Sequence, residues 1–522
     1  MQKTMTIRGY GRSLSEYCRT QERWSRSAQA TSDIRASSRP SFFYKLPAQI
    51  WISSAVLIGV GGFTANPIPT AFAVFSVPLL TSMLWAPGEP PALLFACLMQ
   101  WLQASIAIFY SDWQNVPLEQ MFRSPMFVSA TWLSLIGVLV LALGMRIVLW
   151  RRNDVDKQRA RLQAFELSVP KTFIVYLVSY VVFSLLSELV GPLGGLRQAV
   201  VTLGNLRWIF VFVIMYGTMM QRRHYVFLAM VFGLELVTGV LGFFSEFKTI
   251  FFILLIVVAA ARYSLNGWRL VQLAAVTVTL TTLSLLWFAI RTDYRNVLNE
   301  GSGKQEVRIP IAARIETLRD LSRGVERQSL EDAFEKMIFR VSYVQYFALC
   351  MDNVPAKVAH ENGELWWDSV KQALMPRLLF PDKPIIDDSA RTNHYTGIRV
   401  AGLREGTSIG IGYMGESYID FGSIGMFAPI LSLGVFYGFI YRLFANGPLT
   451  LMGFAIATVI LVFGAAKLEA SNIGLVGGNV TAVILFGLFV WLGAPSLWGW
   501  LAGGARVEIP SPIRMHQIGI QR

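Results

Sequence analysis

The chain has 522 residues, of which 54% are hydrophobic and only 15% are charged, and its formal net charge is +13. A soluble globular protein carries about 25% charged residues, so this composition excludes an ordinary soluble enzyme and favours a protein with many membrane helices. Basic stretches interleaved with aromatic residues are absent, so nucleic acid is not an expected partner. The excess positive charge is instead expected to anchor cytoplasmic segments.

Cysteine and histidine are too few and too scattered to suggest a metal site. The three cysteines, Cys18, Cys97 and Cys350, form no Cys-x-x-Cys pair, and the four histidines form no His-Glu-x-x-His motif. We therefore expect neither a disulfide framework nor a protein-held zinc ion, and the sequence implies no cofactor.

The N-terminal region, residues 1–45, is polar and basic. It holds nine lysine and arginine residues against three acidic residues. The first apolar run begins near Leu46, which is too far along the chain for a cleaved signal peptide. We therefore expect a cytoplasmic basic tail over 1–45, followed by a first span that stays in the membrane.

Apolar stretches near twenty residues long recur along the rest of the chain. They predict an all-α polytopic membrane protein with about twelve transmembrane helices. Helices 1–9 are assigned to 46–290, a large polar loop to 291–425, and helices 10–12 to 426–496. The expected spans are 46–65, 68–86, 91–110, 126–150, 169–188, 206–221, 224–243, 247–263, 268–290, 424–444, 449–467 and 475–496.

The positions of the basic residues test the predicted topology independently of hydropathy. With the N-terminus inside, the basic clusters in 151–168 and at Arg222 and Arg223 face the cytoplasm, as the positive-inside rule requires. The large loop 291–425 then lies outside, and the tail 497–522 returns to the cytoplasm. The charge pattern therefore agrees with the hydropathy pattern.

Short helices are expected inside the large loop. Apolar residues near helical spacing predict them over 311–327, 330–350 and 365–374. Ser329 and Asp332 resemble a capping box at the start of the second helix. We expect these helices to pack over the membrane domain.

The last third of the loop begins with PRLLFPDKP, Pro376 to Pro384. Each proline pushes the residue before it out of the helical region, so this segment is expected to end a helix and form an extended turn. The turn presents Arg377 and Lys383, either as solvated surface charges or as ligands for an anion.

Several polar residues with anion-binding chemistry follow this turn. An arginine side chain presents a planar fork that matches phosphate oxygens and stays charged. These residues either hold a lipid-linked diphosphate or pair with loop acids such as Asp387, Asp388 and Glu405. The candidates are Arg391, His394, Tyr395, Arg399 and Arg404.

The segment GYMGESYIDFGSIG, Gly412 to Gly425, is the most specific motif in the chain. Glu416 and Asp420 are four residues apart, which places them on one face of a helix. Carboxylates near a membrane interface cost free energy unless they are paired or used. Glu416 is therefore a candidate general base for a sugar hydroxyl. The alternative is that both acids cap helices or pair with loop arginines.

Other charged residues lie at the ends of predicted spans or within them. Glu246 and Lys248 mark the start of the span 247–263, and Arg291 and Arg295 open the large loop. Lys248, Arg291 and Arg295 are included as substrate-binding candidates, although charges at such positions often only anchor a span. Glu235 lies within a span, and an ionisable residue there marks either a functional site or a buried hydrogen bond.

The order PRLLFPDKP, then a stretch with tyrosine and arginine, then TSIG and GESYIDFG at the start of a span resembles bacterial oligosaccharide repeat-unit polymerases of the Wzy type. The motif resemblance covers Pro376 to Gly425, and the many spans with one large loop match the general layout. It implies a GT-C-like fold in the bacterial inner membrane, with the large loop in the periplasm.

The resemblance also implies a reaction. A glycan on undecaprenyl diphosphate would be transferred to another lipid-linked repeat unit, with no nucleotide sugar and no metal. Arg377, Arg391 and Arg404 would hold the diphosphate, and Lys383 and Tyr395 would add contacts. Glu416, Asp420 and His394 are the catalytic candidates. The expected partners are the lipid-linked oligosaccharide, membrane lipid, a chain-length regulator and a flippase.

Two other functions remain open. An O-antigen-ligase-like enzyme would use the same donor but transfer the glycan to a lipid A core. A lipid-linked-sugar flippase would show repeated halves and charges along many spans. The single asymmetric loop favours an enzyme over a flippase.

Overall fold

A computed structural model describes residues 42–502 apart from 123, 151–156, 190–193, 244–245, 262–266, 303–306, 376–379, 381–382, 384–386 and 403–407. The chain divides into two units, Met1–Phe43 and Tyr44–Arg522. Nearly all of the first unit and the residues after 502 lie outside the described part, and so do most of the two predicted tails. The description below concerns the second unit.

Throughout its described residues this unit forms helices and no strand. Among the described residues, eight helical stretches are long and apolar enough to cross a membrane, so the chain is an all-α multi-pass membrane protein. They lie in α3 (Pro67–Leu84), α4 (Ala92–Trp113), α6 (Phe127–Leu149), α8 (Val169–Leu189), α9 with α10 (Gly194–Gly204 and Leu206–Gln221), α13 (Gly267–Leu298), α20 (Phe427–Ala445) and α22 (Asn472–Leu492).

Four shorter apolar helices occupy the remaining predicted span positions. They are α2 (Ala48–Gly61), α11 (Tyr225–Leu241), α12 (Lys248–Ala261) and α21 (Thr450–Gly464). Their 14 to 17 residues reach about 21–26 Å at 1.5 Å per residue, less than the ~30 Å of a hydrocarbon core. Every residue of α21 from Thr450 to Val462 is buried, so this short helix packs inside the protein rather than against lipid.

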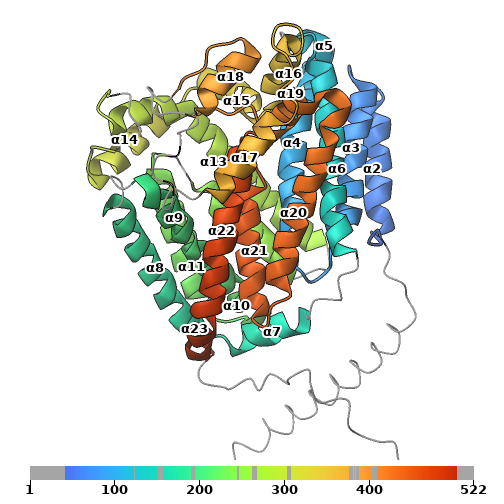
Figure 1. Cartoon of the computed structure of the whole chain (residues 1–522). Coiled ribbons are helices and arrows are strands. Elements are labelled where there is room, and N and C mark those ends of the chain that lie inside the picture. The colour runs from blue at the N-terminus through green and yellow to red at the C-terminus, as the bar shows by residue number, and fades with distance from the viewer. Residues whose placement is uncertain are drawn as a thin grey trace, which may run out of the picture. The chain divides into compact units, whose positions relative to one another are not determined.

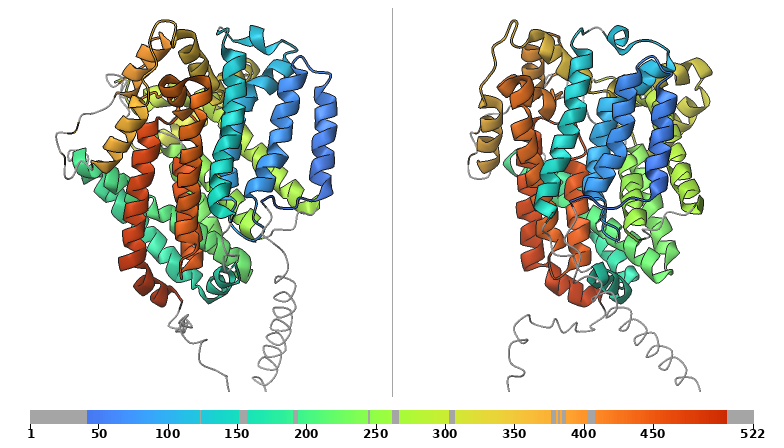
Figure 2. Two further views of the ribbon diagram at one scale, coloured as in Figure 1. Left: turned by 45° about the vertical axis from the view of Figure 1, so that its right-hand side comes forward. Right: turned by 90° about the vertical axis from the view of Figure 1, so that its right-hand side faces the viewer.

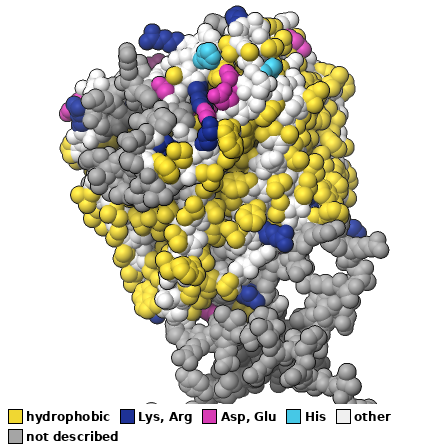
Figure 3. All heavy atoms as spheres, viewed as in Figure 1, with side chains coloured by type: hydrophobic (Ala, Val, Ile, Leu, Met, Phe, Trp, Pro, Cys, Tyr) yellow, Lys and Arg dark blue, Asp and Glu magenta, His cyan; other side chains and the backbone are white. Residues whose placement is uncertain are grey.

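The polar loop helices gather at one end of this unit (Figures 1 and 2). The face seen in Figure 3 is largely hydrophobic below them, and most of its charged side chains lie near the loop-helix end, as expected for a protein surrounded by lipid. The helices at that end are α14 (Ile311–Arg323), α15 (Arg327–Val341), α16 (Val344–Asn353), α18 (Asp388–Thr396) and α19 (Tyr413–Gly425).

The segments predicted to face the cytoplasm meet at the opposite end. The centre of this contact is α7 (Lys157–Glu166), which lies in the predicted connection 151–168. Lys157 Nζ lies 3.8 Å from Glu89, Gln163 Nε2 donates to the carbonyl of Pro448 at 2.9 Å, and the Ser168 N–H donates to the carbonyl of Leu501 in α23 (Ala494–Leu501) at 2.9 Å. Connections that are far apart in sequence therefore share one end, as alternating spans require.

Helices α6 and α20 pack closely because glycines line their contact. A Cβ at Gly144 would overlap the carbonyl oxygen of Leu431, and a Cβ at Gly434 would overlap the carbonyl oxygen of Leu141. Lipid chains are as apolar as leucine, so membrane helices associate through such close backbone packing. This pair fixes α20 beneath the loop helix α19.

Two predictions about loop helices need correction. A continuous helix over 330–350 is wrong, because α15 ends at Val341 and α16 begins at Val344. Ser342 has non-helical torsions at the break, and the hydroxyl of Tyr343 donates to the carbonyl of Gly410 across the loop. The capping box at Ser329 is also wrong, since α15 already begins at Arg327.

Candidate active site

Cationic side chains from three helices converge at the loop-helix end. Lys248 begins α12, and Arg291 lies in the last two turns of α13. Both approach the ring of Phe288, with Lys248 Nζ 5.5 Å and Arg291 Cζ 4.1 Å from its centroid. Arg291 follows Phe288 by three residues, so the two side chains share one face of α13. The aromatic ring therefore lies beside two positive charges.

A third helix adds another cation. Arg340 in α15 lies within electrostatic range of Lys248 and Arg291. Its Nη2 atom lies 2.7 Å from Glu469 Oε2, in the connection between α21 and α22. We call Lys248, Arg291, Arg295 and Arg340 the cation cluster. Together with Glu469, its four positive charges and one negative charge leave a formal charge of +3.

Arg295 ties the end of α13 to the connection between α11 and α12. Its Nε donates to the carbonyl of Phe243 at 3.1 Å, and its guanidinium carbon lies 5.0 Å from the Phe243 ring centroid. The Tyr294 hydroxyl donates to the carbonyl of Leu241 at 3.3 Å. These contacts hold the cluster in place. Like charges so placed repel one another, so the arrangement favours a bound anion.

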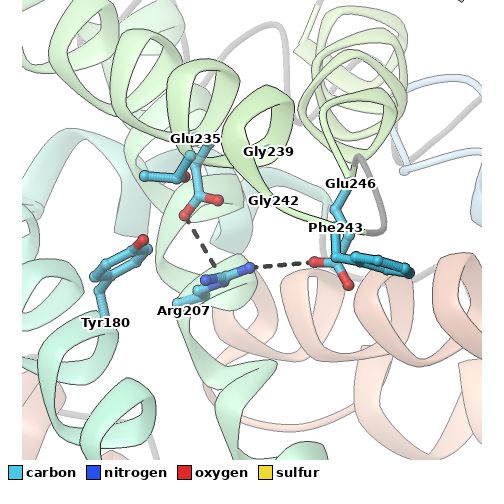
Figure 4. Close-up of a pocket in the computed structure, with 8 residues that line it drawn as sticks. Tyr180, Arg207, Glu235, Gly239, Gly242, Phe243 and Glu246 are labelled. Carbon is cyan, nitrogen blue, oxygen red and sulfur yellow. Dashed lines mark hydrogen bonds and ion pairs between the residues drawn. The ribbon is translucent and has the colours of Figure 1, made fainter. Parts of the chain in front are cut away.

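A charged cavity of about 160 Å³ adjoins the cluster (Figure 4). Arg207 lies between two acids, with Nε 3.8 Å from Glu235 Oε1 and Nη2 3.5 Å from Glu246 Oε2. Glu235 also accepts a hydrogen bond of 2.9 Å from the hydroxyl of Tyr176. The cavity is lined by Tyr180, Arg207, Glu235, Thr238, Gly239, Gly242, Phe243 and Glu246.

Glu416 lies buried in α19 and contacts the start of α22. Its Oε2 accepts the N–H of Asn472 at 2.7 Å, at a helix end where backbone N–H groups otherwise lack partners. Burial raises the pKa of Glu416 to about 8, although the hydrogen bond from Asn472 opposes the shift and nearby Asp388 adds to it. Burial therefore favours the protonated form of this carboxyl group at neutral pH.

Asp420, one turn further along α19, contacts a different helix. It accepts the N–H groups of Leu365 at 3.2 Å and Trp366 at 2.9 Å, in the first turn of α17 (Glu364–Leu374). Burial raises its pKa, and these hydrogen bonds oppose the shift. The two acids lie on one face of α19 as predicted, but each serves as an acceptor for a separate helix start.

Three predicted residues come together on α18. Arg391 Nη2 lies 3.1 Å from Asp368 Oδ2, while its buried Nη1 has no hydrogen-bond partner among the described residues. The Tyr395 hydroxyl donates to Glu361 at 2.8 Å. His394 is exposed and packs edge-on against Tyr395, with ring centroids 4.7 Å apart. Arg391 therefore pairs with Asp368 rather than with Asp387 or Asp388.

The remaining predicted residues divide into two groups. Lys383 Nζ donates to the carbonyls of Gln372 at 2.5 Å and Met375 at 2.9 Å, which places its charge at the C-terminal end of α17. Arg377 and Arg404 fall outside the described residues, and so does most of the proline-rich turn.

The connection between α21 and α22 joins the cation cluster to the loop carboxylates. Glu469 contacts Arg340, the Ser471 hydroxyl donates to Asp388 Oδ2 at 3.3 Å, and the Asn472 N–H donates to Glu416. Four consecutive residues therefore contact both groups. Cations and a carboxyl group with a raised pKa lie at the two ends of one short segment.

Sequence reasoning found Lys248, Arg291 and Arg295 but missed Arg340, Glu469 and Arg207. Arg207 and Arg340 are single charges near helix ends and Glu469 lies in a turn between helices, where surface charges are common. The one available signal was the position of Arg207, two residues into a predicted span.

Comparison with known protein families gives one match. A family described as a domain of unknown function, DUF8712, matches residues 128–466, which is more than half of the chain. The chain belongs to this family. The DUF8712 region contains the cation cluster, Arg207 and Glu416, and it ends before Glu469. No curated protein and no solved structure matches the chain.

Proposed function

We propose that the protein is a polysaccharide polymerase of the bacterial inner membrane. It transfers a glycan from undecaprenyl diphosphate to another lipid-linked repeat unit at the periplasmic face, without metal or nucleotide sugar. The cation cluster is the observation that carries this proposal. Together with Glu469 it carries a formal charge of +3, which suits a diphosphate whose negative charge grows as it leaves. The resemblance of Pro376–Gly425 to Wzy-type polymerases is the second support for the proposal.

The chemistry follows from these groups. The acceptor hydroxyl attacks the anomeric carbon of the donor sugar, and the bond between that carbon and the phosphate oxygen breaks. Undecaprenyl diphosphate leaves with the bonding electron pair, and the cation cluster stabilises its charge. Glu416 takes the hydroxyl proton in its ionised form, which burial makes scarcer at neutral pH but more basic than an ordinary carboxylate. Asp420 and His394 remain secondary catalytic candidates.

The proposed topology has twelve crossings with both termini in the cytoplasm and a GT-C-like fold. The contacts of the 151–168 segment with Glu89, Pro448 and Leu501 support it, because these four segments are all predicted to face the cytoplasm. The loop helices and the cation cluster then lie in the periplasm. The hydrophobic surface below them supplies contact for membrane lipid and for the lipid substrate.

An O-antigen-ligase-like transfer to a lipid A core is the second candidate, since it requires the same diphosphate site. A flippase is less well supported, because the cation cluster lies at one end of the helices rather than along a path through the membrane. A flippase and a chain-length regulator are instead proposed as protein partners.

The test is an assay with purified protein and lipid-diphosphate-linked repeat unit, without added metal or nucleotide sugar. A product ladder on a gel supports a polymerase. Transfer only after addition of a lipid A core indicates a ligase. No transfer in either case overturns both enzymatic proposals.

Substitutions in the cation cluster sharpen this test. Lys248→Ala and Arg291→Ala are each expected to slow transfer about ten- to a hundred-fold, which corresponds to about 1.5–3 kcal/mol for a charge-assisted contact. Arg327→Ala on α15 is the matched control, because Arg327 is 93% exposed and pairs with Glu331 one turn along its own helix. Equal activity of all three variants would contradict the proposed site.

A further inference from the structure

The charged cavity beside the cation cluster has a different electrostatic character from the cluster itself. Arg207 supplies one positive charge, and Glu235 and Glu246 supply two negative charges. The formal charge of this group is therefore −1, against +3 for the cluster with Glu469. A diphosphate is attracted to the cluster and repelled from the cavity.

The two sites are continuous. Phe243 lines the cavity, and its carbonyl accepts the hydrogen bond from Arg295 of the cluster. Glu246 of the cavity and Lys248 of the cluster lie two residues apart on the same connection. A ligand with its anionic part on the cluster would therefore place its next group at the cavity.

We infer that this cavity binds an uncharged sugar ring of the glycan, next to the diphosphate held by the cation cluster. This inference rests on the proposed function and adds a glycan subsite to it. Sugar hydroxyls both donate and accept hydrogen bonds, so a site that offers carboxylate acceptors and guanidinium donors side by side suits them. The cavity supplies both at Glu246 and Arg207, whose side chains are 57% and 22% exposed.

The volume of the cavity is comparable to that of a site for one six-membered ring. A cavity of about 150 Å³ in another protein accommodates a benzene molecule, and this cavity has about 160 Å³. Tyr180 and Phe243 line the cavity, and each ring has a guanidinium group over one face, so the opposite face is the one a sugar ring would contact. Gly239 and Gly242 leave the backbone without side chains along one wall.

The contacts of Arg207 are long for a completed ion pair. Charge-assisted N–H···O contacts are typically 2.7–2.9 Å, whereas Arg207 lies 3.5 Å from Glu246 and 3.8 Å from Glu235. Its guanidinium therefore retains donors that a ligand hydroxyl can use. Glu235 is only 2% exposed and is hydrogen-bonded to Tyr176, so it is a positioning residue that orients Arg207.

The experiment compares two probes on the full-length protein in lipid nanodiscs. Farnesyl diphosphate carries the anion without a sugar, and the repeat-unit oligosaccharide on farnesyl diphosphate carries both. Isothermal titration calorimetry measures each affinity for the wild type, Glu246→Gln and Thr238→Phe. Glu246→Gln removes the negative charge of a group that would accept a hydrogen bond from a sugar hydroxyl. Thr238→Phe fills the cavity, and Thr238→Ser is its matched control.

We expect the sugar-bearing probe to bind wild type more tightly than farnesyl diphosphate. Glu246→Gln and Thr238→Phe should weaken it about ten-fold, as for a lost charge-assisted hydrogen bond. Binding of farnesyl diphosphate should be no weaker in these variants, because one of them removes a negative charge and neither alters a cation.

The outcomes of this experiment distinguish failure of the glycan subsite from failure of the proposed function. If farnesyl diphosphate binds but the sugar adds no affinity, or if neither substitution affects the sugar-bearing probe, the glycan subsite is wrong and the diphosphate site stands. Equal weakening of both probes also overturns the subsite, because it indicates a general structural effect. If wild type binds neither probe, the proposed function fails and the subsite fails with it.

Discussion

Arg340 Nη2 lies 2.7 Å from Glu469 Oε2, and this contact links the loop helix α15 to the connection between α21 and α22. Arg340 is half exposed and Glu469 is one-third exposed, so the pair lies at the surface of the site. Glu469 thus offsets one of the four charges in the cation cluster while it holds Arg340 in position.

Glu469→Gln is expected to increase affinity for farnesyl diphosphate about two- to five-fold. The substitution removes the competing negative charge, and an exposed ion pair is worth about 0.2–1 kcal/mol. The gain should shrink at high ionic strength, because salt screens exposed charges. Titrations at low and high salt check this, with Glu331→Gln on the remote face of α15 as control. A loss of affinity at both salt concentrations would show that Glu469 chiefly positions Arg340.

Phe288→Leu is expected to weaken diphosphate binding about two- to ten-fold. The ring lies 5.5 Å from Lys248 Nζ and 4.1 Å from Arg291 Cζ, and each cation–π contact contributes roughly 0.5–1 kcal/mol. Phe288→Tyr keeps an aromatic face and should retain affinity near the wild-type value. The same titration measures both variants. Equal affinities of the Phe288→Leu and Phe288→Tyr variants for the diphosphate would mean that the ring is only a hydrophobic spacer.

Hydropathy predicted the positions of the apolar helices well, because the free energy of placing a segment in lipid depends on how apolar its own residues are. It predicted a full-length span over 449–467, whereas α21 has only 15 residues. The break at Ser342 was also missed, because it involves a contact between Tyr343 and Gly410 that are far apart in sequence.

The candidate site shows the same division between local and tertiary information. Residue chemistry was enough to nominate Lys248, Arg291 and Arg295, but only packing brings Arg340 beside them. The positions of Glu416 and Asp420 on one face of α19 followed from their spacing. Their partners did not, because the starts of α22 and α17 reach them through tertiary structure. Their catalytic roles remain predictions.

Stability of the wild-type protein should fall as pH rises from about 5 to about 8. The pKa of Glu416 is about 8 in the folded protein against an ordinary value of 4.5, so the folded state binds more protons than the unfolded state across this window. Stability therefore decreases with pH there and levels off above the folded pKa.

Glu416→Gln should reduce this pH dependence. Glutamine cannot ionise, yet its amide oxygen can still accept the Asn472 N–H. Some dependence should remain, because burial also raises the pKa values of Asp388 and Asp420. Apparent thermal unfolding midpoints between pH 5 and 9 measure the effect, with Glu331→Gln as control. Parallel curves for wild type and Glu416→Gln would contradict the assignment.

Asp420 is expected to act chiefly through α17. Asp420→Ala removes the acceptor for Leu365 and Trp366 and should destabilise the protein by about 0.5–2 kcal/mol, as for a lost helix cap. Asp420→Asn keeps an acceptor oxygen and should retain most of the stability and transfer activity. Thermal unfolding and the product-ladder assay separate the two roles. A stable but inactive Asp420→Asn protein would instead support direct catalysis.

The glycine contact between α6 and α20 gives a prediction about folding. Gly434→Ala should destabilise the protein by about 1–3 kcal/mol, because the new Cβ would overlap the carbonyl of Leu141 and force the helices apart. Gly487→Ala in α22 is the matched control, since nothing lies within 4 Å of its Cβ position. That variant should be neutral or slightly stabilised, because alanine favours a helix more than glycine does. Thermal unfolding in detergent measures both, and equal effects would mean that close packing at Gly434 does not hold α20 beneath α19.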